Sequence, residues 1–223
     1  MIGTLNEGAL HAQLKRWYAQ PGDHAEQKVD GYVVDLVRGD LLIEVQTGGF
    51  APLRRKLDVL LESHAVRLVA PVALSRRIVR VSEGGEVLSS RRSPKHGRIE
   101  DVFSRLVSIP TVLAHERFEL EVVLTHEEEI RVFRQGRAWR RRGWVVDGRA
   151  LVEVERSVPL RSPADAARLL PAELPAWFDT AELAAAAGVD RRLAQCIAYC
   201  LRHCGAFECG EKRGRSTLYA FAA

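Results

Sequence analysis

The chain has 223 residues, of which 47% are hydrophobic and 28% charged, and this composition excludes an intrinsically disordered chain. It contains no run of about 20 apolar residues, which excludes a membrane-spanning helix. Its start shows no signal-sequence pattern, so we expect a cytoplasmic protein. The net charge of +4 is uneven: residues 1–130 carry 17 Lys and Arg against 19 Asp and Glu, whereas residues 131–223 carry 16 against 10. The C-terminal part is therefore expected to face a polyanion.

The N-terminal part of the chain alternates between helical and strand-like hydrophobic patterns. In chain order, we expect a helix over residues 6–19, strands over 31–37 and 41–47, a helix over 53–63 and a strand over 66–72. Arg38, Gly39 and Asp40 supply a tight turn between the first two strands. This order predicts an α/β domain, which we place at residues 1–95.

The middle of the chain mixes both patterns around a polar, basic stretch at residues 91–98, which we interpret as a linker. We expect a hairpin of residues 78–81 and 86–89, a helix over 99–107, and strands over 118–124, 129–133, 139–144 and 151–154. Prolines at 163, 171 and 175 mark a second boundary. We therefore expect a mixed α+β region at 96–165 and a separate domain at 172–223.

The last 50 residues predict two helices followed by a hairpin. Asp179 can cap a helix running through Ala187, and a tight turn at residues 188–190 leads to a longer helix over 191–203. Strands over 207–209 and 217–221 then flank a basic tip at 210–216. This order resembles a winged helix-turn-helix domain. Domains of this architecture also serve as protein-interaction modules, so the resemblance leaves both partners open.

In that family the second helix enters the major groove of DNA, and the wing contacts the backbone. The resemblance therefore implies a nucleic-acid-binding role for two sets of residues. The helix set is Arg191, Arg192, Gln195 and Tyr199, and the wing set is Lys212, Arg213 and Arg215.

All four cysteines lie in this C-terminal part, at positions 196, 200, 204 and 209. Their spacing matches none of the usual zinc or iron–sulfur patterns. On a helix, the first three fall on one face beside apolar residues, so we expect them to act as small hydrophobic side chains in a core. Disulfides are not expected in a cytoplasmic protein.

The hairpin at residues 31–47 holds the candidate chemistry. A two-residue turn at Gly39 and Asp40 pairs residues whose numbers sum to 79, which sets Asp35 opposite Glu44. Glu44 and Gln46 share one face of their strand. Two carboxylates at cross-strand distance repel each other unless a cation neutralises them. Oxygen-only ligands favour Mg2+ or Mn2+.

Asp35, the triplet Glu44-Val45-Gln46 and the basic helix after it resemble the PD-(D/E)XK nuclease superfamily. The resemblance implies a restriction-endonuclease-like mixed sheet flanked by helices, with an αβββαβ core. It implies that Asp35, Glu44 and the Val45 carbonyl bind the metal, together with an acidic residue of the first helix, for which Glu7 is available. Asp30 is an alternative to Asp35.

The third residue of the family triplet is normally Lys, which orients the attacking water, and here it is Gln46. Gln can hold a water by hydrogen bonds but brings no positive charge. Lys56, on the following helix, can supply the missing charge from another position.

Two further basic segments are candidates for nucleic-acid contact. Trp139-Arg140-Arg141-Arg142-Gly143-Trp144 interleaves aromatic and cationic side chains, as expected for base stacking and phosphate binding. A half-buried strand with exposed arginines explains it equally. Arg91, Arg92, Lys95 and Arg98 can follow a DNA backbone, although a solvated linker is the simpler alternative.

Together these features predict a metal-dependent DNA endonuclease that a winged helix directs to duplex or structured DNA, in repair or defence. The alternative is a non-catalytic DNA-binding regulator that keeps a nuclease-like scaffold. Mg2+ or Mn2+ is the expected cofactor. DNA is the expected partner, no membrane association is expected, and a homodimer is left open.

Overall fold

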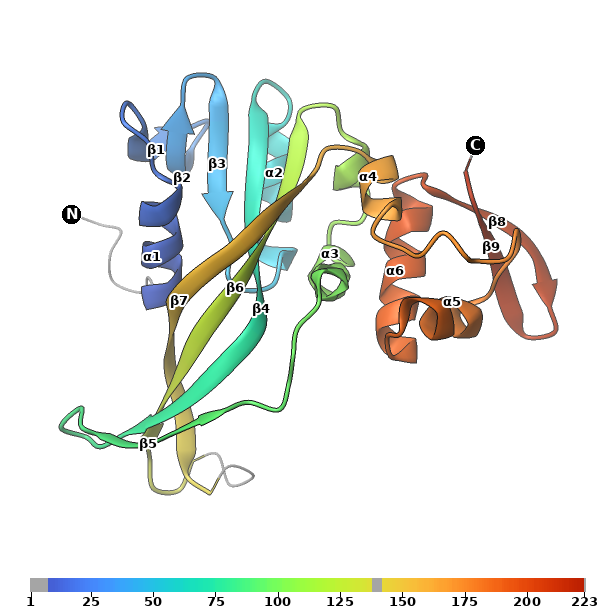
Figure 1. Ribbon diagram of the computed structural model, residues 1–223. Helices are drawn as coiled ribbons and strands as arrows, with labels where there is room; N and C mark the ends of the chain where they lie inside the picture. The colour runs from blue at the N-terminus through green and yellow to red at the C-terminus, as the bar shows by residue number, and fades with distance from the viewer. Residues whose placement is uncertain (1–7, 138–141, 223) are drawn as a thin grey trace.

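The computed structural model describes residues 8–137 and 142–222 and is mixed α/β (Figure 1). In chain order its elements are α1 (Ala9–Tyr18), β1 (His24–Val29), β2 (Tyr32–Arg38), β3 (Leu41–Val45), η1 (Ala51–Leu53), α2 (Arg54–Leu60), β4 (Ala65–Val81), β5 (Val87–Arg92), η2 (Ile99–Val102), α3 (Phe103–Leu106), η3 (Val112–Ala114), β6 (Phe118–Phe133), β7 (Trp144–Leu160), α4 (Pro163–Ala167), α5 (Thr180–Ala187), α6 (Arg191–His203), β8 (Phe207–Arg213) and β9 (Ser216–Phe221), where η marks a 3-10 helix. Within the described residues, seven strands form one sheet in the order β1-β2-β3-β4-β6-β7, with β5 paired to β4.

The N-terminal elements follow the order expected from the sequence, with one addition. β1, β2 and β3 are antiparallel, and β3 runs parallel to β4 after the crossover through α2. The expected hairpin turn is confirmed, and Gly39 adopts the left-handed conformation that such a turn requires, with φ 55°. The sequence did not predict β1, because its residues are almost all exposed and show no alternating apolar pattern.

Both faces of the sheet carry buried hydrophobic side chains. On one face, Leu10 and Leu14 of α1 pack with Ile43 and Val45 of β3. The other face forms a larger cluster with α2, α3 and the C-terminal helices, and Leu42 of β3 belongs to it. β3 is thus buried on both sides, and the residues at its end are held in a fixed position.

The middle of the chain differs from the expectation. β4 and β6 are single long strands that pair in parallel from Val66–Phe118 to Val81–Val132. The sequence predicted two short strands in each, because charged residues such as Arg76 and Glu127 interrupt the apolar pattern. In the structure these two side chains pair with each other across the sheet at 3.3 Å.

The long strands also change the expected domain division. β4 lies before the expected boundary at residue 95 and β6 lies after it, yet they are neighbours in one sheet. The regions 1–95 and 96–165 therefore build one sheet together. The outer parts of β4, β6 and β7, with β5, extend away from the rest of the sheet (Figure 1). We call this extension, residues 75–92, 126–137 and 142–150, the distal arm.

Residues 162–222 form the C-terminal module, and its predicted helices are confirmed. Asp179 caps α5 in a reciprocal capping box with Glu182, and Asp190 caps α6. The hairpin differs from the prediction, because β8 and β9 pair as far as Arg213 and Ser216. The expected seven-residue basic tip is therefore a tight turn at the end of two longer strands.

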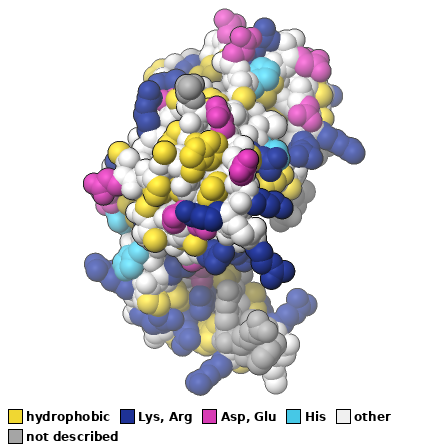
Figure 2. All heavy atoms as spheres, turned by 90° about the vertical axis from the view of Figure 1, so that its right-hand side faces the viewer, with side chains coloured by type: hydrophobic (Ala, Val, Ile, Leu, Met, Phe, Trp, Pro, Cys, Tyr) yellow, Lys and Arg dark blue, Asp and Glu magenta, His cyan; other side chains and the backbone are white. Residues whose placement is uncertain are grey.

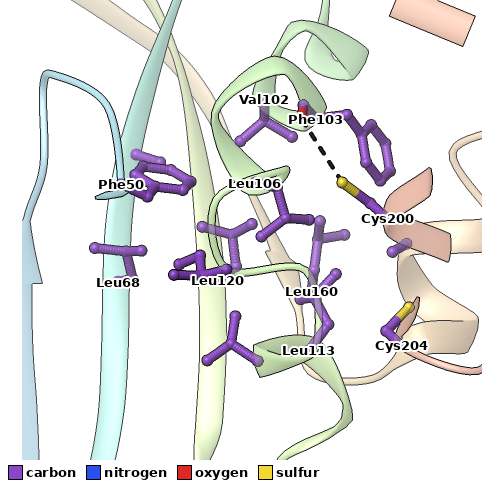
Figure 3. Close-up of a cluster of buried hydrophobic side chains, with 14 of the residues drawn as sticks. Phe50, Leu68, Val102, Phe103, Leu106, Leu113, Leu120, Leu160, Cys200 and Cys204 are labelled. Carbon is purple, nitrogen blue, oxygen red and sulfur yellow. Dashed lines mark hydrogen bonds between the residues drawn. The ribbon is translucent and has the colours of Figure 1, made fainter. Parts of the chain in front are cut away.

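The C-terminal module shares its core with the sheet. Figure 3 shows Cys200 of α6 against α3, where its thiol lies 3.7 Å from the carbonyl oxygen of Phe103. Cys200 and Cys204 are buried in the large cluster, as expected for small hydrophobic side chains, whereas Cys209 is exposed. The expected separate domain is thus packed firmly onto the rest of the chain.

An ion pair between Arg38 and Asp23 ties β2 to the loop after α1. The Arg38 guanidinium donates two hydrogen bonds to the Asp23 carboxylate, both at 2.8 Å, and a third to the carbonyl of Tyr18. The hydrogen bonds from Arg38 lower the pKa of Asp23 to about 2. The stabilisation is therefore complete above the pKa of the unfolded state, near 4, and is lost as the pH falls to about 2.

We expect Asp23→Asn to lower the free energy of unfolding at pH 7 by about 1–3 kcal/mol, the range for a hydrogen bond to a charged group. Urea unfolding of the two proteins at a series of pH values tests this. The difference between them should shrink as the pH falls from about 4 towards about 2. A difference that stays constant over this interval would show that the charge of Asp23 does not contribute.

Candidate active site

The candidate site lies where β2 and β3 separate. Their ladder ends at the pair Leu36–Ile43, so the predicted pair of Asp35 and Glu44 lies just beyond the paired residues. The two carboxylates are nonetheless close enough for the charge of Asp35 to act on Glu44. Both side chains are largely buried, with 16% of Asp35 and 13% of Glu44 exposed. Two carboxylates therefore occupy neighbouring strands at one place in the sheet.

Asp35 is fixed by two hydrogen bonds. Its Oδ2 accepts one from the backbone N–H of Val45 at 2.8 Å and lies 3.2 Å from Nε2 of His11 on α1. His11 could not be selected from the sequence, because it is a single polar residue on an amphipathic helix. The contact needs α1 to pack on this face of the sheet.

Glu44 is paired with the lysine that sequence reasoning selected. Lys56 Nζ on α2 lies 2.5 Å from Glu44 Oε2 and also donates to the carbonyl of Val33 at 2.6 Å. Its side chain is only 12% exposed. The crossover from β3 through α2 thus places the positive charge of Lys56 next to the Glu44 carboxylate.

The two carboxyl groups differ in acidity. Burial raises the pKa of Glu44 above its usual value, and the nearby charge of Asp35 adds to this, while Lys56 acts in the opposite direction. Burial also tends to raise the pKa of Asp35, but the hydrogen bonds from His11 and Val45 outweigh it and hold that pKa below its usual value. Asp35 is therefore the firmly ionised member of the pair.

The other predicted residues of the site are more scattered. Gln46 continues the ladder through its N–H to the carbonyl of Val69, and its side-chain amide donates to the carbonyl of Gly49 at 2.7 Å. Asp30 lies in the turn between β1 and β2, where it is 2.9 Å from His64. The register therefore favours Asp35 over Asp30 as the partner of Glu44. Glu7 lies outside the described residues.

Arg105 of α3 holds the loop that follows β3, and the sequence did not reveal it. Its guanidinium donates to the carbonyls of Gln46, Gly48 and Pro71 at 3.3, 3.4 and 2.9 Å. It also lies over the ring of Phe50, 4.8 Å from its centre. The short helix that packs against α6 therefore also positions the loop next to the candidate site.

The donor atoms at the site suit a hard divalent cation. Asp35 and Glu44 offer carboxylate oxygens, and Val45 lies between Glu44 and Gln46 with a backbone carbonyl. Their mutual repulsion, seen in the raised pKa of Glu44, is the kind that a cation relieves. Among the residues that the structure describes, no group of three or more His, Cys, Asp or Glu is placed to hold a metal.

The predicted nucleic-acid-binding residues lie mostly at the surface. Arg191, Arg192, Gln195 and Tyr199 are exposed along α6, opposite the side that packs on the core. Lys212 and Arg215 are exposed on the hairpin, as are Arg92, Lys95 and Arg142 elsewhere. Arg140 and Arg141 lie outside the described residues. Figure 2 shows Lys and Arg side chains on the flank of the module and over the distal arm.

Arg213 departs from this pattern. Its guanidinium is hydrogen-bonded to Glu182 and lies 3.8 Å from Asp179, so its charge is neutralised at the start of α5. It therefore ties the hairpin to α5.

Comparison with known proteins places the chain in a family. Residues 8–161 match the family described as "Domain of unknown function (DUF8091)". The chain belongs to the DUF8091 family. An uncharacterized protein of Treponema pallidum (strain Nichols) is 34% identical over 221 residues, which cover 98% of this chain and 86% of that protein. No solved structure matches.

The DUF8091 region coincides with a structural unit. It begins directly before α1 and ends directly after β7. It therefore contains the whole seven-stranded sheet of the described residues and the residues of the candidate site that the structure describes. The C-terminal module follows it. Within the described parts of the chain, no helix is long and apolar enough to cross a membrane.

Proposed function

We propose that this DUF8091 protein is a Mg2+-dependent DNA endonuclease whose site is formed by Asp35, Glu44 and Lys56. The observation that carries the proposal is the pair of largely buried carboxylates on β2 and β3, just beyond the last pair of their ladder, with Lys56 Nζ 2.5 Å from Glu44. Paired carboxylates beside a lysine are suited to hydrolysis of a phosphodiester bond, where negative charge develops on phosphate oxygens.

The order of elements supports this proposal. α1, three antiparallel strands, α2 and a strand parallel to the third follow one another as in the αβββαβ core of PD-(D/E)XK nucleases. Asp35 and Glu44 lie on the second and third strands, as this resemblance implies, whereas Lys56 brings its charge from α2 and not from the third position of the triplet.

Each residue has a distinct role in the proposal. Asp35 and Glu44 would hold the metal, which would polarise the phosphate and lower the pKa of bound water. Lys56 keeps Glu44 ionised and offers a positive charge to the reacting phosphate. Gln46 has its amide nitrogen engaged by Gly49, so its amide oxygen is the atom left to accept a hydrogen bond from the attacking water.

The C-terminal module would bind duplex DNA as a winged helix. A bridge between Phe178 and Tyr219 adds a third short strand segment to the β8–β9 hairpin, next to α5 and α6. The exposed stripe of α6 carries Arg191, Arg192 and Gln195, which suit phosphate and base-edge contacts. The proposal does not depend on a free charge at Arg213.

The proposed activity is tested with supercoiled, linear and branched DNA, each incubated with Mg2+, Mn2+ or EDTA. We expect cleavage of at least one substrate with either metal and none with EDTA. A non-catalytic regulator is the second candidate, and Gln46 at the place where the nuclease family has lysine is the observation that favours it. Metal-independent binding of the same DNA with no cleavage would support that candidate instead.

We expect the combined change of Arg191, Arg192, Lys212 and Arg215 to Gln to weaken duplex binding at least about 100-fold and to reduce its salt dependence, because each lost phosphate contact lowers the slope by roughly 0.9. Anisotropy titrations at several salt concentrations measure both. Arg213→Gln is the matched control on the same hairpin, and it should bind nearly as the wild type does. Coinciding titrations of the fourfold variant and the wild type would assign the module to protein partners.

Substitution is preferable to deletion of residues 172–223 here. Phe178, Ile197 and Leu201 belong to the same buried cluster as Phe103 and Leu106 of α3. Removing the module would expose that cluster and confuse a loss of DNA binding with a loss of folding.

A further inference from the structure

A large polar pocket lies where the distal arm joins the rest of the sheet. It encloses about 610 Å3, within the range of roughly 300–1,000 Å3 that is typical of small-ligand sites. Thr47, Gly48 and Gly49, the loop after the Glu44 strand, form part of its wall. Residues of β4, β6, β7 and the 93–105 segment form the remainder.

The carboxylates of the pocket are already engaged. Glu127 and Glu129, both buried, pair with Arg76 at 3.3 and 3.4 Å, and Glu129 also pairs with Arg131 at 2.5 Å. Asp101 accepts a hydrogen bond from the backbone N–H of Arg98 at 3.0 Å. Glu127 and Glu129 are therefore neutralised by arginines, whereas Asp101 keeps its charge, which acts on Arg105.

Three other cations line the pocket without such a partner. Arg105 donates to backbone carbonyls, as described above, and Lys95 and Arg149 make no ion pair within the described part of the chain. Arg149 stands opposite Glu129 in the β6–β7 ladder, but Glu129 is bonded to two other arginines. Burial, and after it the charge of Arg149, lowers the pKa of Arg105 to about 10. Positive charge is thus concentrated at this wall.

We infer that this junction pocket binds a phosphate-bearing ligand of nucleotide size through Arg149 and Lys95. The lining carries five cationic side chains (Arg76, Lys95, Arg105, Arg131 and Arg149) against three carboxylates (Asp101, Glu127 and Glu129), and this excess of positive charge favours an anion. Ser93 and Ser104 on the same wall add hydroxyl donors that suit phosphate oxygens. The volume exceeds the need of an inorganic ion. That the phosphate belongs to a nucleotide rests on the proposed function, because the pocket shares the 47–49 loop with the candidate active site.

The inference is tested by fluorescence anisotropy in EDTA, so that no cleavage occurs. The probe is a 5′-phosphorylated deoxythymidine trinucleotide with a 3′ fluorophore, competed with thymidine monophosphate, with the unphosphorylated trinucleotide and with a blunt duplex. The variant is Arg149→Gln combined with Lys95→Gln. Arg156→Gln is the control, because Arg156 is exposed on the same strand but does not line the pocket.

We expect the phosphorylated probe to bind the wild type and Arg156→Gln equally, and the double variant at least about 10-fold more weakly, as for loss of a charge-assisted hydrogen bond. Competition by thymidine monophosphate would identify a free nucleotide as sufficient, and competition only by the phosphorylated trinucleotide would identify a strand. Equal binding by the double variant and the wild type, or no binding of the phosphorylated probe, would overturn the inference.

The nuclease proposal and the pocket inference can be refuted independently of each other. Glu44→Gln should bind the probe as the wild type does, because Glu44 does not line the pocket. Probe binding that depends on Arg149 in a protein that cleaves no DNA would refute the nuclease and keep the pocket. Metal-dependent cleavage with no phosphate-dependent probe binding would refute the pocket and keep the nuclease.

Discussion

Glu44→Gln is expected to reduce metal-dependent cleavage at least about 1,000-fold while duplex binding stays within a few-fold of the wild type. Glu44 lies opposite Asp35 and against Lys56, far along the chain from the basic residues of the module. The substitution removes a negative charge where the metal would bind but preserves the size of the side chain. Initial cleavage rates, Mn2+ binding by calorimetry and DNA anisotropy measure the three effects on one preparation.

Asp30→Asn is the matched control for this experiment. Asp30 is also acidic and lies at the start of the same hairpin, but it is exposed and paired with His64. Its substitution should leave cleavage within a few-fold of the wild type. The reverse result, an inactive Asp30→Asn and an active Glu44→Gln, would move the site to the β1–β2 turn.

Lys56→Met is expected to slow cleavage by roughly 100- to 1,000-fold at neutral pH, the range for removal of one charged group from a preorganised site. The substitution should also shift the pH dependence of the cleavage rate. Because Lys56 lowers the pKa of Glu44, its removal raises that pKa further, and Glu44 then stays protonated up to a higher pH. The acid limb of the cleavage profile should therefore move to higher pH.

Single-turnover rates between pH 5 and pH 9 test this expectation. Lys56→Arg keeps the charge and should recover part of the rate with the original profile. Arg55→Met, an exposed neighbour on α2, controls for loss of charge from that helix. An unchanged profile in Lys56→Met would mean that the ion pair has no part in the reaction.

The core of the candidate site was predictable because it depends on local geometry. A two-residue turn fixes the register of β2 and β3 as far as the pair Leu36–Ile43, and Asp35 and Glu44 are the next residues on the two strands. That Lys56 could bring a positive charge to the site was also predictable, since a short crossover must return α2 to the sheet beside β3. The caps of α5 and α6 followed from single residues, Asp179 and Asp190.

Other parts of the structure depend on contacts between distant segments. Arg105 reaches Gln46 across 59 residues and His11 reaches Asp35 across 24. Neither contact has a signature in one sequence. The full length of β4 and β6 could not be predicted from the sequence, because Arg76 interrupts the apolar pattern of β4 and Glu127 interrupts that of β6. In the structure these two side chains pair, and both strands continue past them. The residues of β1 are almost all exposed, so their sequence has no alternating apolar pattern that would predict a strand.

The most direct test of the account is single-turnover cleavage of end-labelled DNA by the wild type and by Asp35→Asn at saturating Mg2+. Asp35 is the firmly ionised member of the pair, so its substitution removes the carboxylate on which metal binding would chiefly depend in the proposed site. We expect the wild type to form labelled product with Mg2+ and none with EDTA, and Asp35→Asn to form none within the same time. Equal rates for the two proteins, or no product from the wild type with any DNA or metal, would contradict the account.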